Sequence, residues 1–273
     1  IKLINGETTT AKIILKQEEY EGNSRNVILD MPGEIEDTIV FTAHYDSTSL
    51  SQGAYDNMSG SVIIMELLRY FAAHPPKRTM KFNWYGSEEQ GLLGSKAWVK
   101  SHEDELDKHV LMINVDVAAA TLGKNIAPTL ATEGAVGYVD ALMREIGVAC
   151  DVKLDIYSSD CVPFADKGVP AVNLCRFGTQ GAGYIHDRRD NLKNNFMSEK
   201  ALDITLQQTL AFSKRVVNAK TFPIKPMTKD EAILQMNLLE HSFFAFRDED
   251  NGGSFAVVYR RNDGGYGLIQ DVE

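Results

Sequence analysis

Apolar residues follow two alternating periodicities over the first 220 residues of the chain. Short runs such as DTIVFTAH and TMKFNWYG are almost continuously apolar, which is typical of strands buried on both faces. Between such runs, apolar positions recur every three or four residues, as at Val62, Ile63, Leu67 and Phe71, and this spacing predicts amphipathic helices. Strands that alternate with helices predict an α/β fold, in which a mixed, mostly parallel sheet is sandwiched by helices.

The expected elements cover most of this region. We expect strands at residues 37–44, 79–86, 109–117, 152–157 and 170–177, and helices at 59–74, 88–102, 135–147 and 201–219. Residues 11–31 contain two extended runs around a Gly-Asn-Ser turn, which predicts a hairpin at the edge of the sheet.

The character of the chain changes at Thr221. Two prolines precede a short helical run at 231–240, and three strand-like runs follow at 243–248, 254–261 and 264–270. We therefore expect two domains, residues 1–220 and a small α+β domain at 221–273. Adjacent apolar residues in the later runs, such as Phe243 and Phe244, predict strands buried on both faces and hence a partner surface.

Composition and charge exclude several classes of protein. The 273 residues are 44% hydrophobic and 24% charged, which excludes a disordered or collagen-like chain. A net charge of −10 argues against direct binding of nucleic acid, and no apolar run approaches the ~20 residues that a membrane span requires. Three cysteines cannot all form internal disulfides, so we expect reduced thiols and a cytoplasmic protein, which agrees with the bacterial, cytoplasmic origin that a resemblance of the C-terminal segment, given below, implies. Secretion is the alternative if a leader was removed before Ile1.

Histidine and acidic residues follow several of the expected strands. Because functional groups gather at the carboxyl ends of strands in such sheets, we expect these side chains to converge. Two imidazoles and three carboxylates form a ligand set suited to one or two zinc ions. The residues at these positions are His44, Asp46, Asp56, Glu88, Glu89, Asp116 and His186.

The adjacent acidic residues Glu88 and Glu89 have two interpretations. Neighbouring side chains diverge, so one carboxylate can bind a metal while the other acts as a general base on water. Alternatively, both are exposed glutamates at a helix N-terminus, where negative charge is favourable.

Six motifs, in order and spacing, resemble the dizinc aminopeptidases of peptidase family M28. They are AHYDS, GAYDNMSG, GSEEQGLLGS, INVD, SSDCVPFADKGVPAV and IHDRRDNLKN, and the resemblance covers residues 26 to 215. It implies a zinc-exopeptidase fold, two zinc ions as cofactors, with other divalent metals as an alternative, and release of N-terminal amino acids from peptides.

The resemblance also implies a role for each matching residue. His44 and Asp116 would hold one zinc ion, Glu89 and His186 the other, and Asp56 would bridge both. Glu88 would be the general base that activates a metal-bridging water. Asp46 would orient His44, and Asp190 would support the side of the site that contains His186.

Three positions depart from the family pattern. Val117 and the two following alanines replace a methionine and a nearby glycine, Cys161 replaces a frequent histidine, and Asp187 replaces a threonine. No metal ligand is lost. We expect these departures to lie near the substrate and to affect its side-chain preference.

Residues 222–273 resemble the C-terminal dimerisation domain of long-form bacterial ribosome hibernation promoting factors. The matching segments are EAILQM, HSFFAFR, VVYRR and DGGYGLI. This resemblance implies a homodimer formed through residues 222–273. Pairing with a hibernation factor itself is a further alternative.

Two other functions compete with the aminopeptidase. A single-zinc acyl transferase resembling glutaminyl cyclases would share the scaffold, although those enzymes carry glutamate where this chain has Asp116. A non-catalytic binding protein would use the C-terminal segment for assembly. Zinc stoichiometry separates the first alternative from a peptidase, and a Glu88→Gln variant separates the second.

Overall fold

The structure is a computed structural model of the whole chain. It describes residues 5–6, 10, 12–16, 18, 21–155, 158–178, 183–194, 196–215, 226–238, 242–261 and 263–270. The chain divides into two compact units, Ile1–Val216 and Val217–Glu273. The boundary expected between residues 220 and 221 lies outside the described residues.

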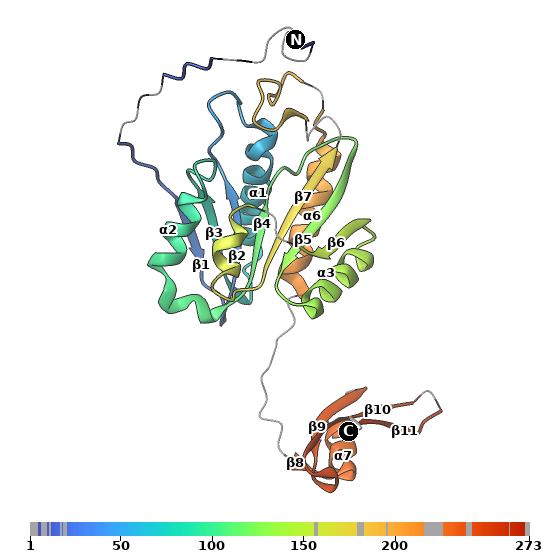
Figure 1. Cartoon of the computed structure of the whole chain (residues 1–273). Helices are drawn as coiled ribbons and strands as arrows, with labels where there is room; N and C mark the ends of the chain where they lie inside the picture. Colours follow the sequence, from blue (N-terminus) through green and yellow to red (C-terminus); the bar gives the residue numbers. More distant parts are fainter. Residues whose placement is uncertain are drawn as a thin grey trace. The chain divides into compact units, whose positions relative to one another are not determined.

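A seven-stranded mixed sheet forms the centre of the first unit (Figure 1). Its strand order is β1-β3-β2-β4-β7-β5-β6, and the four pairs β3–β2, β2–β4, β4–β7 and β5–β6 are parallel. Only β1–β3 and β7–β5 are antiparallel among the pairs of this sheet in the described residues. The strands are β1 (Val27–Met31), β2 (Ile35–His44), β3 (Arg78–Tyr85), β4 (His109–Val115), β5 (Gly123–Leu130), β6 (Cys150–Leu154) and β7 (Ala171–Gly178).

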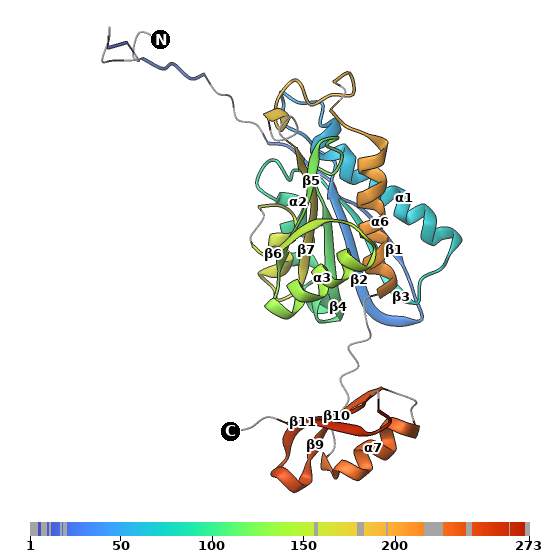
Figure 2. The same ribbon diagram turned by 90° about the vertical axis from the view of Figure 1, so that its right-hand side faces the viewer.

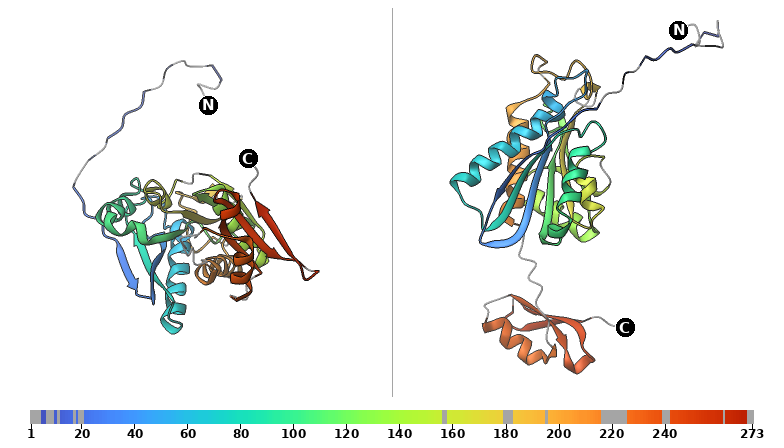
Figure 3. Two further views of the ribbon diagram at one scale, coloured as in Figure 1. Left: turned by 90° about the horizontal axis from the view of Figure 1, so that it is seen from below. Right: turned by 90° about the vertical axis from the view of Figure 1, so that its left-hand side faces the viewer.

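Helices cover both faces of this sheet, as Figures 2 and 3 show. On one face α6 packs against α1 and α3, and on the other face α4 lies against β4 and β7 and contacts α2. The helices are α1 (Ser59–Ala73), α2 (Leu93–Ser101), α3 (Glu133–Glu145), α4 (Cys161–Ala165) and α6 (Glu199–Arg215), with short helical turns η1 (Ala54–Met58) and η2 (Glu103–Lys108). This arrangement confirms the predicted α/β class.

Alternation along β2 explains the two cores of this unit. Ile39, Phe41 and Ala43 belong to the core beneath α1 and α6, whereas Val40 belongs to the core beneath α2 and α4. Successive side chains of a strand point to opposite faces, so a strand covered on both sides must be apolar throughout. The continuous apolar run in the sequence is the consequence.

Two predictions about strands in this unit were wrong or incomplete. The expected edge hairpin is not formed in the described residues, because β1 pairs with β3 and residues 12–16 are not in a strand. Strand β5 was not predicted at all. Its sequence, GKNIAPTL, contains glycine, proline, asparagine and lysine, which are all unfavourable in strands.

The second unit is a small α+β structure. Its sheet has the order β11-β10-β9-β8, and α7 packs on one face around Met236, Phe246 and Val258. The elements are β8 (Pro226–Met227), α7 (Lys229–Leu238), β9 (Phe243–Asp248), η3 (Glu249–Asn251), β10 (Ser254–Arg260) and β11 (Tyr266–Gln270). The order of helix and strands agrees with the prediction, and β8 is an additional short strand.

Within the described residues, no helix combines the length and the apolarity that crossing a bilayer demands.

Candidate metal centre

Three neighbouring parallel strands bring acidic and histidine side chains to one edge of the sheet. His44 is the last residue of β2, Asp116 directly follows β4, and Glu88 and Glu89 follow β3 by three and four residues. Because β3, β2 and β4 are adjacent and parallel, their carboxyl ends lie side by side. The convergence expected from the sequence is therefore present.

Two groups of potential ligands lie at this edge. One consists of His44, Glu88 and Asp116, and the other of Asp56, Glu89 and His186; in each group the ligand atoms lie within 4.8 Å of one another. His186 comes from the loop after β7, and Asp56 from η1. Imidazole nitrogens and carboxylate oxygens at such distances can hold divalent cations.

Asp56 connects the two groups. Its Oδ1 lies 3.1 Å from Nε2 of His44, and its Oδ2 lies 3.1 Å from Nε2 of His186. On the outer sides, Nε2 of His44 is 3.4 Å from Oδ1 of Asp116, and Nε2 of His186 is 2.9 Å from Oε2 of Glu89. One carboxylate thus faces both groups with a different oxygen for each.

The adjacent glutamates separate between the two groups. Glu88 belongs with His44 and Asp116, whereas Glu89 belongs with Asp56 and His186. Neither residue lies in a helix, since α2 begins only at Leu93. The interpretation as exposed glutamates at a helix N-terminus is therefore wrong.

Burial and the neighbouring charges shift the pKa values of several of these side chains. Burial raises the pKa of Glu88 to about 9, and burial together with the neighbouring Asp56 raises the pKa of Glu89 to about 7. Burial lowers the pKa of His44, but the carboxylate of Asp116 outweighs it and the net pKa is above the ordinary value. Raised pKa values favour the protonated forms of Glu88, Glu89 and His44, and bound cations would displace such protons.

The donor set suits zinc. Oε1 of Glu89 and Oδ1 of Asp116 are buried and have no hydrogen-bond partner among the described residues. Buried carboxylate oxygens are costly unless they are paired or coordinate a metal. Buried carboxylate oxygens without a hydrogen bond, beside two imidazoles, therefore fit a pair of divalent ions.

Asp46 contacts residues of both groups. Its Oδ1 lies 3.5 Å from Nδ1 of His44, and its carboxylate accepts hydrogen bonds from the backbone N–H groups of Glu88 (3.0 Å) and Glu89 (3.2 Å). Burial raises the pKa of Asp46, but the hydrogen bonds from His44 and from the Glu88 backbone lower it further, so the net pKa is below its usual range. An ionised Asp46 can hold the His44 ring in one orientation.

Asp190 holds the segment that carries Asp56. Its fully buried carboxylate accepts hydrogen bonds from the backbone N–H groups of Tyr55 (2.7 Å) and Asp56 (3.0 Å), and from the Ser51 hydroxyl (3.3 Å). The resemblance to the family implies that Asp190 supports the side of the site that contains His186. In the structure its hydrogen bonds go to the bridging Asp56 segment.

Sequence reasoning missed a buried polar network beneath Asp116. The Ser159 hydroxyl donates to Oδ2 of Asp116 at 2.8 Å, and the Asn114 amide donates to Ser159 and to Asn173. Asp160 is also fully buried, and neither of its carboxylate oxygens has a hydrogen-bond partner among the described residues. Ser159 and Asp160 lie in the motif SSDCVPF and Asn114 lies in INVD, but serine and asparagine have no spacing rule that would assign them.

Several residues with a strained backbone conformation lie at the candidate metal centre. Ser87, Val117 and His186 have φ angles of 59°, 54° and 60°, which non-glycine residues rarely adopt. Each is a predicted ligand or a neighbour of one. Strained positions cluster at functional sites, where the surrounding structure must hold them.

The departures from the family pattern have different environments. Cys161 is fully buried with Trp98 and Phe164 beneath α4, and Val117 is buried beside Tyr55. Asp187 is partly exposed and forms an ion pair with Arg189, Nε to Oδ1, at 2.7 Å. Of the three, Asp187 is the most accessible to a ligand.

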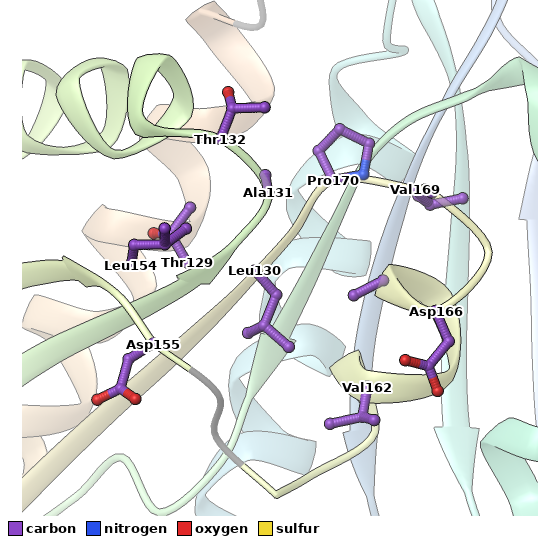
Figure 4. A pocket seen from close by; sticks show the side chains of 12 residues that line it. Thr129, Leu130, Ala131, Thr132, Leu154, Asp155, Val162, Asp166, Val169 and Pro170 are labelled. Atoms are coloured by element: carbon purple, nitrogen blue, oxygen red, sulfur yellow. The ribbon is translucent and has the colours of Figure 1, made fainter.

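A hollow of the first unit lies away from the residues of the candidate metal centre (Figure 4). Its volume is about 710 Å³, and Leu130, Leu154, Val162 and Pro170 line it. Leu130 ends β5 and Ala171 begins β7, whereas the candidate ligands His44 and Asp116 lie at the carboxyl ends of β2 and β4. This hollow is therefore at the opposite edge of the sheet from the candidate metal centre.

Comparison with protein families gives two matches. Residues 26–213 match the model of peptidase family M28. Residues 212–268 match the model described as the C terminus of sigma 54 modulation/S30EA ribosomal protein.

Individual relatives agree with these matches. Aminopeptidase YwaD of Bacillus subtilis (strain 168) is 32% identical over 186 residues, which cover 64% of this chain and 41% of YwaD. The ribosome hibernation promotion factor of Staphylococcus aureus (strain COL) is 53% identical over 58 residues, 21% of this chain and 30% of that protein. The chain thus spans less than half the length of either relative.

Among solved structures, BSAP, a zinc aminopeptidase from Bacillus subtilis, has the same fold as the first unit. The TM-score is 0.63 at 26% identity, and the match covers 72% of this chain and 51% of BSAP.

Proposed function

Because this chain belongs to peptidase family M28, we propose that it is a zinc-dependent aminopeptidase that releases single amino acids from the N-termini of peptides. The observation that carries the proposal is the position of Asp56, with one oxygen 3.1 Å from His44 and the other 3.1 Å from His186. A carboxylate placed in this way suits a centre with two metal ions. The names of YwaD and BSAP, an aminopeptidase and a zinc aminopeptidase, support the same activity.

In this proposal His44 and Asp116 hold one zinc ion, Glu89 and His186 hold the other, and Asp56 holds both. The zinc ions, when bound, acidify water and polarise the scissile carbonyl. Three ligand carboxylates leave part of the charge of two dications uncompensated, which stabilises developing negative charge on the substrate.

Glu88 is the proposed general base. Its carboxylate lies with His44 and Asp116, apart from the ligand Glu89. In the reaction Glu88 takes a proton from the attacking water and then gives it to the nitrogen of the leaving peptide. Burial raises its pKa in the metal-free protein, and nearby dications lower it towards the range in which a base works at neutral pH.

Two carboxylates beyond the three proposed ligands, Glu88 and Asp46, favour a substrate with a free amino terminus. The centre contains four carboxylates, Asp56, Glu88, Glu89 and Asp116, and Asp46 lies beside them. A free α-amino group is attracted to such a site, whereas a free carboxylate is repelled.

For the second unit we propose dimerisation of the whole chain. Phe243, Phe255 and Ile269 point from the sheet face opposite α7 and remain exposed, Phe243 at 62% and Ile269 at 60%. A second copy of this face would bury these side chains. The 53% identity to a ribosome hibernation promotion factor supports an assembly role, and pairing with such a factor is the alternative.

A substrate panel tests the proposed activity. Zinc-reconstituted protein is given aminoacyl-nitroanilides and short peptides, each with a free or an acetylated amino terminus. We expect release of unblocked first residues, abolished by a chelator and by acetylation. Cleavage of blocked peptides, or no hydrolysis of any substrate, would contradict the proposal.

A further inference from the structure

A groove runs between α1 and the start of α6, which lie side by side (Figure 2). It consists of two adjoining hollows of about 270 and 310 Å³ that share Val62, Glu199 and Leu202. The walls come from one side of α1, from the first turns of α6 and from Leu192, Asn194, Met197 and Ser198.

Apolar side chains that are exposed to solvent form the floor of the groove. Met58 is 46% exposed, Val62 is 40% exposed, and Leu192 is 80% exposed. Contiguous apolar side chains on a surface mark a place where another chain or ligand binds.

The groove begins at the loops that form the candidate metal centre. Ala54 and Met58, two residues on either side of Asp56, both line it. Leu192 follows Asp190, whose carboxylate holds the backbone of Asp56, by two residues. A polypeptide with its first residue at the metal centre therefore has a binding surface next to the same segment of the chain.

The charge of the groove is of one sign. Glu66, which forms an ion pair with Arg69 at 2.8 Å, Glu199 and Asp203 line it, and no lysine or arginine is among the described residues that line the two hollows. Apolar floor and acidic walls are complementary to a segment in which apolar residues alternate with basic ones.

On the basis of the proposed aminopeptidase activity, we propose that this groove binds the downstream part of polypeptide substrates, and selects those with apolar and basic residues after the first few positions. The first residue lies at the metal centre, and the following residues extend towards Met58 and Val62. Short substrates do not reach the groove. The preferred substrates are then peptides or unfolded chain termini rather than dipeptides.

Matched substrates and variants test this inference. One octapeptide begins with leucine and ends in alternating leucine and lysine, and a second ends in alternating glycine and aspartate. Leucine nitroanilide reports activity at the metal centre alone. We expect wild type to have at least a tenfold higher kcat/KM for the leucine–lysine peptide than for the glycine–aspartate peptide, as roughly one well-filled apolar subsite gives.

Val62→Asp places a charge on the groove floor at an exposed position of α1. We expect it to lower kcat/KM for the leucine–lysine peptide about tenfold, while hydrolysis of leucine nitroanilide stays within about twofold of wild type. Ala72→Asp, an exposed change in the last turn of the same helix, is the control and leaves both substrates unaffected. Equal effects of Val62→Asp on both substrates, or no effect on either, would overturn the inference.

A second variant covers the case in which Val62→Asp fails to fold. Glu66→Gln removes one exposed carboxylate of the groove and is expected to lower the preference for lysine over aspartate without changing nitroanilide hydrolysis. An unchanged preference of Glu66→Gln for lysine over aspartate overturns the inference. A change of molar mass in Val62→Asp also overturns it, because the groove would then be a contact between copies of the chain. If wild type does not hydrolyse leucine nitroanilide, the proposed function fails instead.

Discussion

Oδ1 of Asp46 lies 3.5 Å from Nδ1 of His44, on the side of the imidazole opposite the nitrogen that faces Asp56. The same carboxylate accepts hydrogen bonds from the backbone N–H groups of Glu88 and Glu89. A single side chain therefore orients one proposed ligand of the first ion, the proposed base and one ligand of the second ion.

Asp46→Asn tests this relationship. The amide keeps the shape but loses the charge, and its NH2 group replaces one of the two oxygens that accept hydrogen bonds from the Glu88 and Glu89 backbone. We expect zinc affinity to fall roughly 10- to 100-fold, measured by competition with a chelator of known affinity. Asp104→Asn, at an exposed position in η2, is the control. An Asp46→Asn protein with wild-type zinc affinity would show that Asp46 does not support the centre.

Glu88→Gln separates catalysis from metal binding. If Glu88 moves the proton and does not hold zinc, the variant should bind as much zinc as wild type and lose about 10²- to 10⁴-fold in kcat. Zinc content by mass spectrometry and peptide hydrolysis are measured on the same sample. Loss of zinc would make Glu88 a ligand, and retained turnover would exclude it as the base.

Asp160 predicts a pH dependence of stability in the metal-free protein. Burial raises its pKa from 3.8 to about 7, so the folded state keeps a proton that the unfolded state releases. The stability from this group is present below about pH 4 and is lost as the pH rises to about 7. Asp160→Asn, which stays neutral, should not show this loss.

Urea unfolding of the metal-free proteins between pH 4 and pH 8 measures the difference. The free energy of unfolding of Asp160→Asn relative to wild type should increase by an amount on the order of a few kcal/mol over this range and then level off. Parallel curves for the two proteins would mean that Asp160 is ionised at all these pH values.

The dimer proposal rests on the outer face of the small sheet. Ile269→Asp places a charge among Phe243 and Phe255 on that face, and we expect a monomer of 30.3 kDa by light scattering where wild type has twice this mass. Leu234→Asp, an exposed change on α7 at the opposite face, should remain dimeric. A wild-type monomer, or an equal effect of both variants, would refute this dimer.

The sequence was most informative where a parallel sheet determines position. His44, Asp116 and the two glutamates follow strands that became neighbours, so reading the strand ends was enough to expect their convergence. The sequence could not show that Asp190 holds the backbone of Asp56, because 134 residues separate the two.

Elements that depend on tertiary pairing were harder to predict. The sequence of β5 contains several residues that are unfavourable in strands. Pairing with β6 on one side and β7 on the other therefore determines its conformation. Residues Val27–Met31 are a strand as expected, but pair with β3 rather than with the residues before them. Local patterns identify a strand without identifying its partner.

Ser159 and Asn114 illustrate the same limit within the site. Both are fully buried, and together they carry a hydrogen-bond chain to Asp116. Neither residue type has a pattern that predicts burial. Only the packing of the segment before α4 against β4 places them beneath the metal ligand.

Zinc titration of the metal-free protein tests the central claim most directly, with hydrolysis of a leucine-initiated peptide measured at each addition. A centre bridged by Asp56 predicts that activity reaches its plateau at two zinc ions per chain, and that the acetylated peptide is never cleaved. A plateau at one zinc ion, together with cyclisation of a glutamine-initiated peptide in place of hydrolysis, would contradict it.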